Sequence, residues 1–358
     1  MKKSVLILSF LLLTVGWMST ITAQTDFDVK GLCIAAPGKS DVDDFVRLIN
    51  EKLAPAGVNT LVLRVDFGYE YKSRPELRSG NPLSETDVKK IVSACKKHNI
   101  NLIPQVNLLG HQSWASEIGK LLEVYPQFDE TPSIKLPAEY KWPNPDGLYC
   151  KSYCPQHPDV HAVVFDLVDE IIEVFESDAF HAGMDEVFYI AHDDCERCKG
   201  GDPAVLFAGE VAKIRNHLAQ NDKKLWIWGD RLIDGKTTGI GLWEGSYNNT
   251  HRAIDLIPKD VVINDWHYEK AHATPVLFAS KGFDVIACPW RTPEVATNQV
   301  KMIGMLKNNA SGEMKPRYKG IMHTFWSGAR TFIDGMNDVE KAKDDPSVKT
   351  FKELVKVW

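Results

Sequence analysis

Short apolar runs alternate with longer amphipathic stretches along the chain from Lys30 onward. The apolar runs are rich in Val, Ile and Leu, which is typical of strands buried on both faces of a parallel sheet. No linker-like or low-complexity segment interrupts this alternation. We predict eight strands, over residues 31–36, 60–65, 101–106, 179–184, 225–228, 261–264, 284–288 and 320–324.

The amphipathic stretches between these runs carry helix start signals. Ser84-x-x-Asp87 has the form of a capping box that opens a helix to His98. Asp202-Pro203 supplies a cap residue and a first-turn proline to a helix that reaches Asn221. The apolar spacing predicts further helices over residues 41–53, 160–175 and 339–357.

Eight strand-helix units predict an α/β fold, a single-domain (β/α)8 TIM barrel over residues 24–358. A doubly wound open sheet is the alternative architecture. That alternative expects a glycine-rich phosphate fingerprint after the first strand, where Pro37-Gly38-Lys39 stands instead.

Two adjacent acids, Asp185 and Glu186, follow the fourth predicted strand. Adjacent carboxylates repel each other and resist desolvation, so a fold keeps such a pair at the mouth of a buried strand mainly where chemistry requires it. Neighbouring residues of an ideal strand face opposite ways, so both acids converge only where the strand ends in a bend or bulge. We interpret them as the catalytic pair; a surface turn with two solvated acids is the alternative.

Other candidate residues follow the carboxyl ends of the remaining strands, where functional residues of a barrel gather. Four tryptophans stand at four successive strand ends, and indoles suit the C–H faces of a pyranose, while acids and histidines bond its hydroxyls. The predicted substrate-binding residues are Asp66, His111, His181, Trp228, Asp230, Asp265, Trp266, Trp290 and Trp326. The alternatives are core packing for each tryptophan and a buried, backbone-satisfied ring for each histidine.

The first two dozen residues differ in composition from the rest. Lys2-Lys3 precede an apolar block from Val5 to Met18, which predicts a signal peptide over residues 1–23 and an exported, periplasmic or secreted product. No second apolar block suggests a membrane span after its removal. A net charge of -6 with interspersed signs argues against nucleic acid as a partner.

Export would give the seven cysteines an oxidising environment. Cys150-x3-Cys154 and Cys195-x2-Cys198 lie in polar, loop-like stretches. Their spacing is only half of a zinc-ribbon pattern, so it favours a disulfide or stapled loop over a structural zinc. Because the acids around His192 are equally well explained by a solvated loop, we expect no metal in the active site and no cofactor.

The segment His181-Ala182-Gly183-Met184-Asp185-Glu186 resembles the His-x-Gly-Gly-Asp-Glu signature of glycoside hydrolase family 20, the β-N-acetylhexosaminidases. Residues 104–111 resemble the family's Pro-Glu-x-Asp-x-Pro-Gly-His segment, and the resemblance extends over residues 31–326. It implies a retaining enzyme that acts on glycans or glycoconjugates with a terminal amino sugar. It also implies a substrate-assisted mechanism, in which the 2-acetamido oxygen attacks the anomeric carbon.

In such a mechanism Glu186 protonates the leaving oxygen and later activates water, while Asp185 orients the acetamido N–H. Glu186 then needs a raised pKa, which desolvation and the charge of Asp185 would provide.

The chain departs from the family pattern around the acid pair. The strand-one arginine is missing, with Arg64 or Arg74 as candidate substitutes, and Trp290 stands near strand seven in place of a clear tyrosine for the acetamido carbonyl. Gln105 and Asn107 replace acids, and Ser327-Gly328 replaces the glutamate often found after the last tryptophan. Trp142 and Tyr149 are candidates for an outer subsite or a packed cover.

Three alternative functions remain open on the sequence. Asp185 and Glu186 could act with Glu244, Asp230 or Asp265 as a two-carboxylate glycosidase on another sugar. A sugar-binding barrel without catalysis and a metal-assisted hydrolase are the other two.

Overall fold

A computed structural model describes residues 26–140 and 150–358 of the chain. The predicted signal peptide, Trp142 and Tyr149 lie outside the described residues. No helix in the described part combines the length and apolar character needed to cross a bilayer.

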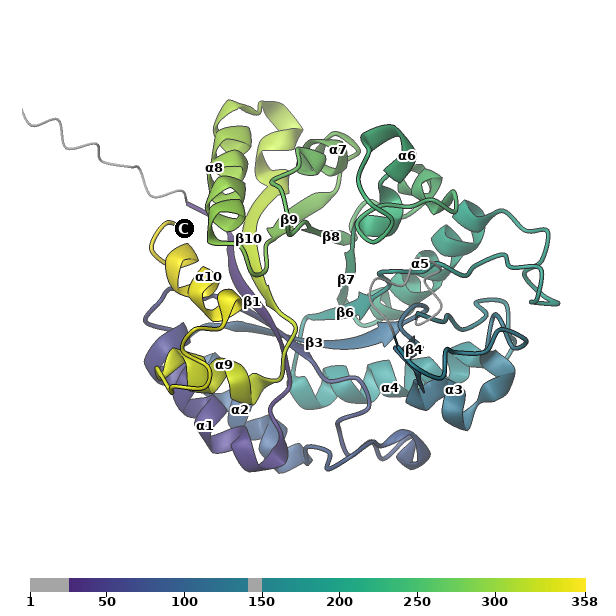
Figure 1. The fold of residues 1–358 in the computed structure, drawn as a ribbon, viewed down its shortest axis with the longest axis horizontal. Helices are drawn as coiled ribbons and strands as arrows, with labels where there is room; N and C mark the ends of the chain where they lie inside the picture. Colours follow the sequence, from purple (N-terminus) through teal and green to yellow (C-terminus); the bar gives the residue numbers. More distant parts are fainter. Residues whose placement is uncertain (1–25, 141–149) are drawn as a thin grey trace, which may run out of the picture.

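Eight parallel strands close into a barrel in the order β1-β10-β9-β8-β7-β6-β3-β2, and helices surround it (Figure 1). The predicted TIM barrel is confirmed, and every predicted strand is present. The barrel strands are β1 (Val29–Ala35), β2 (Thr60–Arg64), β3 (Asn101–Leu108), β6 (Ala179–Gly183), β7 (Lys224–Trp228), β8 (Val262–Trp266), β9 (Asp284–Cys288) and β10 (Tyr318–Phe325). A short hairpin, β4 (Ser113–Trp114) and β5 (Glu117–Ile118), follows β3.

The helices mostly begin where the sequence predicts. The capping box of Ser84 and Asp87 is formed at the start of α2, and the Asp202 side chain accepts a hydrogen bond from Ala204 N at the start of α5. The helices are α1 (Val42–Leu48), α2 (Glu85–Lys97), α3 (Lys120–Val124), α4 (Val160–Phe175), α5 (Pro203–Ala219), α6 (Gly235–Thr238), α7 (Thr274–Ser280), α8 (Pro293–Asn309), α9 (Ala329–Met336) and α10 (Pro346–Leu354).

One predicted helix is too long. Within residues 339–357 only α10 is helical, because Pro346 occupies its first turn and the Asp345 side chain caps the backbone N–H groups of Ser347 and Val348. Residues 339–344 form turns instead.

The side chains of the strands alternate between two cores. On β1, Leu32 and Ile34 pack outward against the helices, whereas Cys33 belongs to a separate cluster that fills the inside of the barrel. Trp226 and Trp228 of β7 also belong to this inner cluster. The barrel is therefore a packed core, and a ligand has access only to its carboxyl-end face.

Candidate active site

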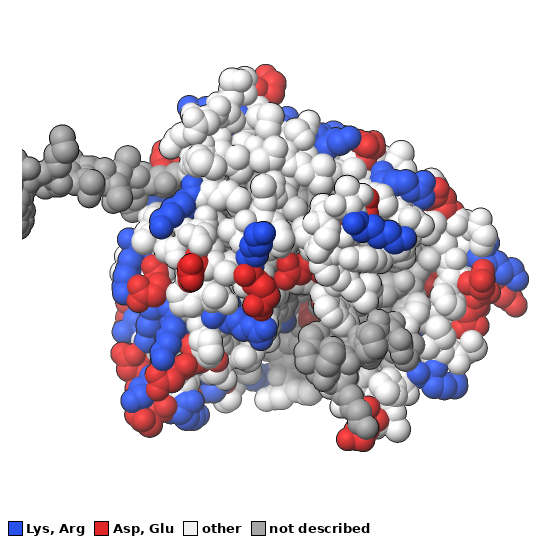
Figure 2. Space-filling model, turned by 45° about the horizontal axis from the view of Figure 1, so that its top comes forward, with Lys and Arg blue, Asp and Glu red and all other residues white. Residues whose placement is uncertain are grey.

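A pocket of about 870 Å³ opens at the carboxyl ends of the strands. This volume is typical of small-molecule sites. Its lining includes seven of the predicted site residues: Asp66, His111, Asp185, Glu186, Trp266, Trp290 and Trp326. On the molecular face shown in Figure 2, acidic and basic side chains are interspersed, with no extended patch of one sign.

The backbone bends sharply after β6, as the adjacent acids require. Gly183, Met184 and Glu186 all have positive φ angles, of 67°, 67° and 51°. A left-handed conformation is costly for residues with side chains, and such strain is concentrated at functional sites. The bend turns Asp185 and Glu186 toward one pocket, which an extended strand would not do.

Two glycines make room for this bend. A Cβ on Gly183 would lie 2.2 Å from Asn107 Oδ1, and a Cβ on Gly110 would lie 2.4 Å from the carbonyl oxygen of Asp185. Both positions exclude larger residues because the clashing atoms belong to the site itself.

His111 lies between the two acids. Its Nε2 is 3.1 Å from Asp185 Oδ2 and 3.4 Å from Glu186 Oε2. Burial lowers the pKa of His111, but the charge of Asp185, the interaction with Cys150 and the hydrogen bonds to both together outweigh burial and raise the pKa well above its ordinary value. His111 is therefore a cation against which an ionised carboxylate is stabilised.

The two acids have pKa values shifted in opposite directions. Burial raises the pKa of Asp185, but the His111 charge and hydrogen bond outweigh it, so the net pKa is lowered. Burial first, and then the charge of Asp185, raises the pKa of Glu186 to about 7, as predicted. At neutral pH Asp185 is ionised and Glu186 is partly protonated, the division expected of a stabilising carboxylate beside a general acid.

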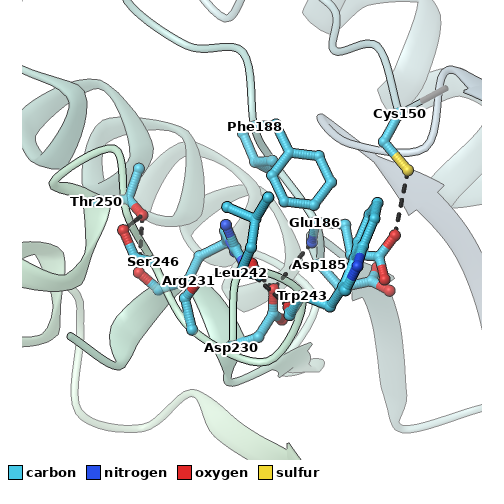
Figure 3. Close-up of polar contacts among 12 residues, drawn as sticks. Cys150, Asp185, Glu186, Phe188, Asp230, Arg231, Leu242, Trp243, Ser246 and Thr250 are labelled. Atoms are coloured by element: carbon cyan, nitrogen blue, oxygen red, sulfur yellow. Dashed lines mark hydrogen bonds and ion pairs between the residues drawn. The ribbon is translucent and has the colours of Figure 1, made fainter. Parts of the chain in front are cut away.

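Cys150 directly contacts Glu186, the carboxyl group whose pKa is raised. Its thiol donates a hydrogen bond to Glu186 Oε2 at 3.2 Å, and its sulfur lies 3.8 Å from His111 Nδ1 (Figure 3). Burial raises the pKa of Cys150, so the thiol stays protonated and remains a donor. Sequence reasoning missed this role because it grouped Cys150 with Cys154.

A buried ion pair holds the backbone of the acid pair from below. Asp230 Oδ2 accepts hydrogen bonds from Glu186 N at 2.9 Å and from Arg231 Nε at 2.6 Å (Figure 3). Arg231 Nη2 also donates to the carbonyl oxygens of Leu242 and Trp243. The pair therefore links the Glu186 loop to the loop that carries Trp243 into the pocket.

Aromatic rings form the opposite wall. Tyr268 packs against Trp266 and Trp290, with ring centroids 4.9 and 5.2 Å apart, and its hydroxyl accepts a hydrogen bond from Trp326 Nε1 at 2.7 Å. Trp243 also lines the pocket. Tyr268 and Trp243 were not predicted; Tyr268 lies two residues beyond the Trp266 that ends β8, where a search of each strand end would find it.

Arg64 occupies the region of the missing strand-one arginine. It pairs in register with Ala35 of β1, and its guanidinium crosses to β10, where it bonds the carbonyl oxygens of Phe325 and Trp326 and lies 4.7 Å from the Trp326 ring centroid. Arg74, the other candidate, pairs with Asp166 outside the pocket lining.

Four predicted contact residues lie outside the pocket lining. Trp228 is fully buried because β7 turns it into the barrel, and His181 packs against it with ring centroids 4.6 Å apart. Asp230 is committed to Glu186 N and Arg231, and Asp265 to His267 and Thr274. We correct their assignment from substrate contact to support of the site.

The amides that replace family acids form a chain beneath the pocket. Gln105 Nε2 donates to Asn107 Oδ1 at 3.0 Å, and Asn107 N donates to Asp66 Oδ1 at 2.8 Å. Neutral groups at these two positions keep additional negative charge away from the buried Asp185.

Comparisons with known proteins agree with this geometry. The model of glycosyl hydrolase family 20, catalytic domain, matches residues 63–320. The chain is 22% identical over 261 residues to a lacto-N-biosidase of Bifidobacterium bifidum, covering 69% of this chain and 20% of that protein. It is 23% identical over 217 residues to a β-hexosaminidase of Emericella nidulans, covering 57% of this chain and 32% of that protein.

Solved structures share the fold. The chitobiase of Flavobacterium johnsoniae superposes with a TM-score of 0.63 at 16% identity, covering 92% of this chain and 50% of that chain. A β-N-acetylhexosaminidase superposes with a TM-score of 0.64 at 15% identity, covering 93% of this chain and 72% of that one. The chain spans about a fifth to a third of the length of the curated relatives named above.

Proposed function

The chain belongs to glycosyl hydrolase family 20, and from that premise we propose that it removes a terminal β-linked N-acetylhexosamine with retention of configuration. The observation that carries this proposal is the pair of adjacent acids in one pocket, with the pKa of Asp185 lowered and that of Glu186 raised. A substrate-assisted reaction needs one ionised carboxylate to hold the acetamido group and one protonated carboxyl to reach the leaving oxygen.

Asp185 is suited to the acetamido group. Its Oδ2 is held by His111, while its Oδ1 is buried and has no hydrogen-bond partner within residues 26–140 and 150–358. A buried acceptor without a partner is costly, and an amide N–H from the substrate would satisfy it. We assign this oxygen to the acetamido N–H, which turns the acetamido carbonyl oxygen toward the anomeric carbon.

The steps then follow. The acetamido oxygen forms a bond to the anomeric carbon as the glycosidic bond breaks, and Glu186 gives its proton to the departing oxygen. Asp185 stabilises the positive charge of the resulting oxazolinium ion. Water then attacks the anomeric carbon while the Glu186 carboxylate takes its proton, and the bond between the anomeric carbon and the acetamido oxygen breaks to restore the amide.

Tyr268 is our candidate for the tyrosine that was not identified near strand seven in the sequence. It lines the pocket between Trp266, Trp290 and Trp326, and burial raises its pKa well above the ordinary value, so its hydroxyl remains a donor. The indole rings offer flat surfaces to the apolar face of a pyranose.

The two-carboxylate alternative has less support. Asp230 and Asp265 are buried, with 1% exposure each, and lie outside the pocket lining. Glu244 lines the pocket, but its Oε2 is 2.7 Å from His267 Nδ1 and its Oε1 accepts from Tyr268 N. Asp230 and Asp265 therefore lie away from a ligand in the pocket and both Glu244 oxygens have protein partners, whereas Asp185 lines the pocket and its Oδ1 has no hydrogen-bond partner in the described part of the chain.

Hydrolysis of paired aryl β-glycosides tests the proposal. The 2-acetamido substrate should be cleaved, and the otherwise identical 2-hydroxy substrate should not, because it lacks the internal nucleophile. Glu186→Gln should lose about 10²- to 10⁴-fold in rate, whereas the exposed Glu123→Gln on α3 serves as a control with full activity.

Equal cleavage of both substrates would overturn the substrate-assisted mechanism and favour two carboxylates. Sugar binding without turnover of either substrate, unchanged in Glu186→Gln and Asp185→Asn, would identify a binding protein instead.

We also propose export, on the basis of Lys2-Lys3 and the apolar block that follows them; retention of residues 1–23 in mature protein recovered from cells would contradict it.

A further inference from the structure

A second cluster of reactive side chains lies outside the active-site pocket. Glu130, Cys154, Cys195 and Cys198 are all buried, and each offers one ligand atom within 4.8 Å of the others. None of the four lines the pocket that contains Asp185 and Glu186. We propose that this cluster is a structural zinc site with three thiolate ligands and one carboxylate.

The thiols are arranged as a set of three and not as one pair. Cys154 Sγ lies 3.3 Å from Cys198 Sγ and 3.4 Å from Cys195 Sγ. A tetrahedral zinc with bonds of about 2.3 Å separates its sulfurs by about 3.8 Å, so small side-chain adjustments bring the three into place. A disulfide would use two of the thiols and leave the third unpaired.

All seven cysteines, each within the described residues, are free thiols. The sequence-based preference for a disulfide is therefore not met. Its grouping of two pairs was also wrong, because Cys150 lies beside Glu186 and only Cys154 of that pair joins the cluster. Without Cys150, the cluster contains three thiols. All three can bind one metal ion, whereas disulfide formation would leave one of them unpaired.

Glu130 supplies the fourth ligand. It is fully buried, and its Oε1 accepts a hydrogen bond from His192 N at 3.2 Å. Its Oε2 has no hydrogen-bond partner in the part of the chain that the structure describes. A buried carboxylate oxygen without a partner is unfavourable, and a metal ion in the cluster would resolve it. Four protein ligands and no open position are typical of a structural zinc.

Backbone hydrogen bonds hold the proposed ligand residues close together. Cys195 and Cys198 flank a tight turn in which Lys199 N donates to Cys195 O and Gly201 N donates to Cys198 O. A Cβ on Gly201 would come within 2.9 Å of Cys198 O, so glycine permits this turn. On the other side, Cys154 N donates to Phe128 O. This hydrogen bond sets Cys154 beside the segment that carries Glu130.

The proposed ion would join two connections of the barrel. Glu130 and Cys154 belong to the excursion between β3 and α4, and Cys195 and Cys198 belong to the connection between β6 and α5. The first connection also carries Cys150, and the second carries Asp185 and Glu186 near its start. We therefore assign the ion a structural role in fixing these connections above the barrel, distinct from any Lewis-acid role in the reaction.

Elemental analysis of the purified full-length chain tests the site. After dialysis against zinc and removal of loosely bound ion, we expect about one zinc per chain. Cobalt offered in place of zinc should produce the thiolate-to-cobalt charge-transfer absorption of a thiolate site. Chelation should lower the melting temperature.

Matched variants distinguish loss of a zinc ligand from loss of any buried thiol. Cys198→Ser should lose the zinc, whereas Cys95→Ser, a buried thiol on α2 outside the cluster, should retain it. Glu130→Gln should keep all three thiols yet weaken zinc binding more than about tenfold in competition with a chromophoric chelator. The wild-type measurements do not depend on any variant folding.

A zinc-free wild-type protein after dialysis, or a mapped disulfide between any two of Cys154, Cys195 and Cys198, would overturn the proposal. Equal zinc content in wild type and Cys198→Ser would do the same, because it would locate the ion elsewhere.

Discussion

Replacement of Cys150 by alanine should move the working pH of the site upward. The thiol of Cys150 donates to Glu186 Oε2 at 3.2 Å and so favours the ionised form of that carboxyl. A hydrogen bond of this kind contributes about 1 kcal/mol. Because one pKa unit corresponds to about 1.4 kcal/mol, its loss raises the pKa of Glu186 by about 0.7, from its value of about 7.

The pH dependence of kcat/KM measures this change. In the proposed mechanism Glu186 must be protonated to act as the acid, so activity falls as pH rises through its pKa, and a raised pKa moves this basic limb to higher pH. The acid limb reflects Asp185, which must be ionised, and lies below its ordinary pKa of 3.8 because His111 stabilises the charged form.

Cys150→Ser is the matched control for the hydrogen bond. A hydroxyl is a stronger donor than a thiol. The basic limb of Cys150→Ser should therefore lie at or below the pH of the wild-type limb, whereas the limb of Cys150→Ala should lie at higher pH. If the alanine and serine variants shift together, or the alanine variant does not shift upward, then burial and the neighbouring charges set the pKa of Glu186 without the thiol, and the argument from donation fails.

Three further predictions concern the support of the site. Asp230→Ala leaves the buried Arg231 without its partner carboxylate, so the free energy of unfolding should fall by about 3–5 kcal/mol in denaturant titrations; equal stability would contradict it. Arg64→Lys cannot both bond two carbonyls and stack on Trp326, so KM should rise more than kcat falls, and an unchanged KM would refute this. Gly110→Ala should lower both kcat and Tm because its Cβ meets Asp185 O, whereas Gly209→Ala in the open face of α5 should raise stability by up to about 1 kcal/mol; a Gly110→Ala protein with wild-type kcat would argue against the close contact.

The barrel could be predicted from the sequence because its strands are buried on both faces. Such strands appear as short apolar runs, for example residues 61–63 within β2, and these runs mark strand positions without any need to know their partners. The extent of the last helix was less predictable. Apolar residues recur loosely from Val339, but the backbone becomes helical only where Asp345 and Pro346 provide a cap and a first turn.

Parts of the site were less accessible to sequence reasoning. The acid pair was found because both residues follow one strand, and a bend was the only way to bring them together. The direction in which Trp228 points depends on the pleat of β7, so a position at a strand end did not reveal that it faces the barrel interior. Trp243 reaches the pocket and Cys150 reaches Glu186 from long connections, and their contacts depend on tertiary packing that local pattern does not encode.

The thiol that contacts the proposed general acid belongs to the long connection after β3, whereas Glu186 itself closely follows the barrel strand β6. Connections tolerate replacement far better than strands do. A change confined to that connection therefore offers a route to a lower or higher pH optimum. Exchange of this connection between relatives should alter the pH optimum without any change to the barrel strands.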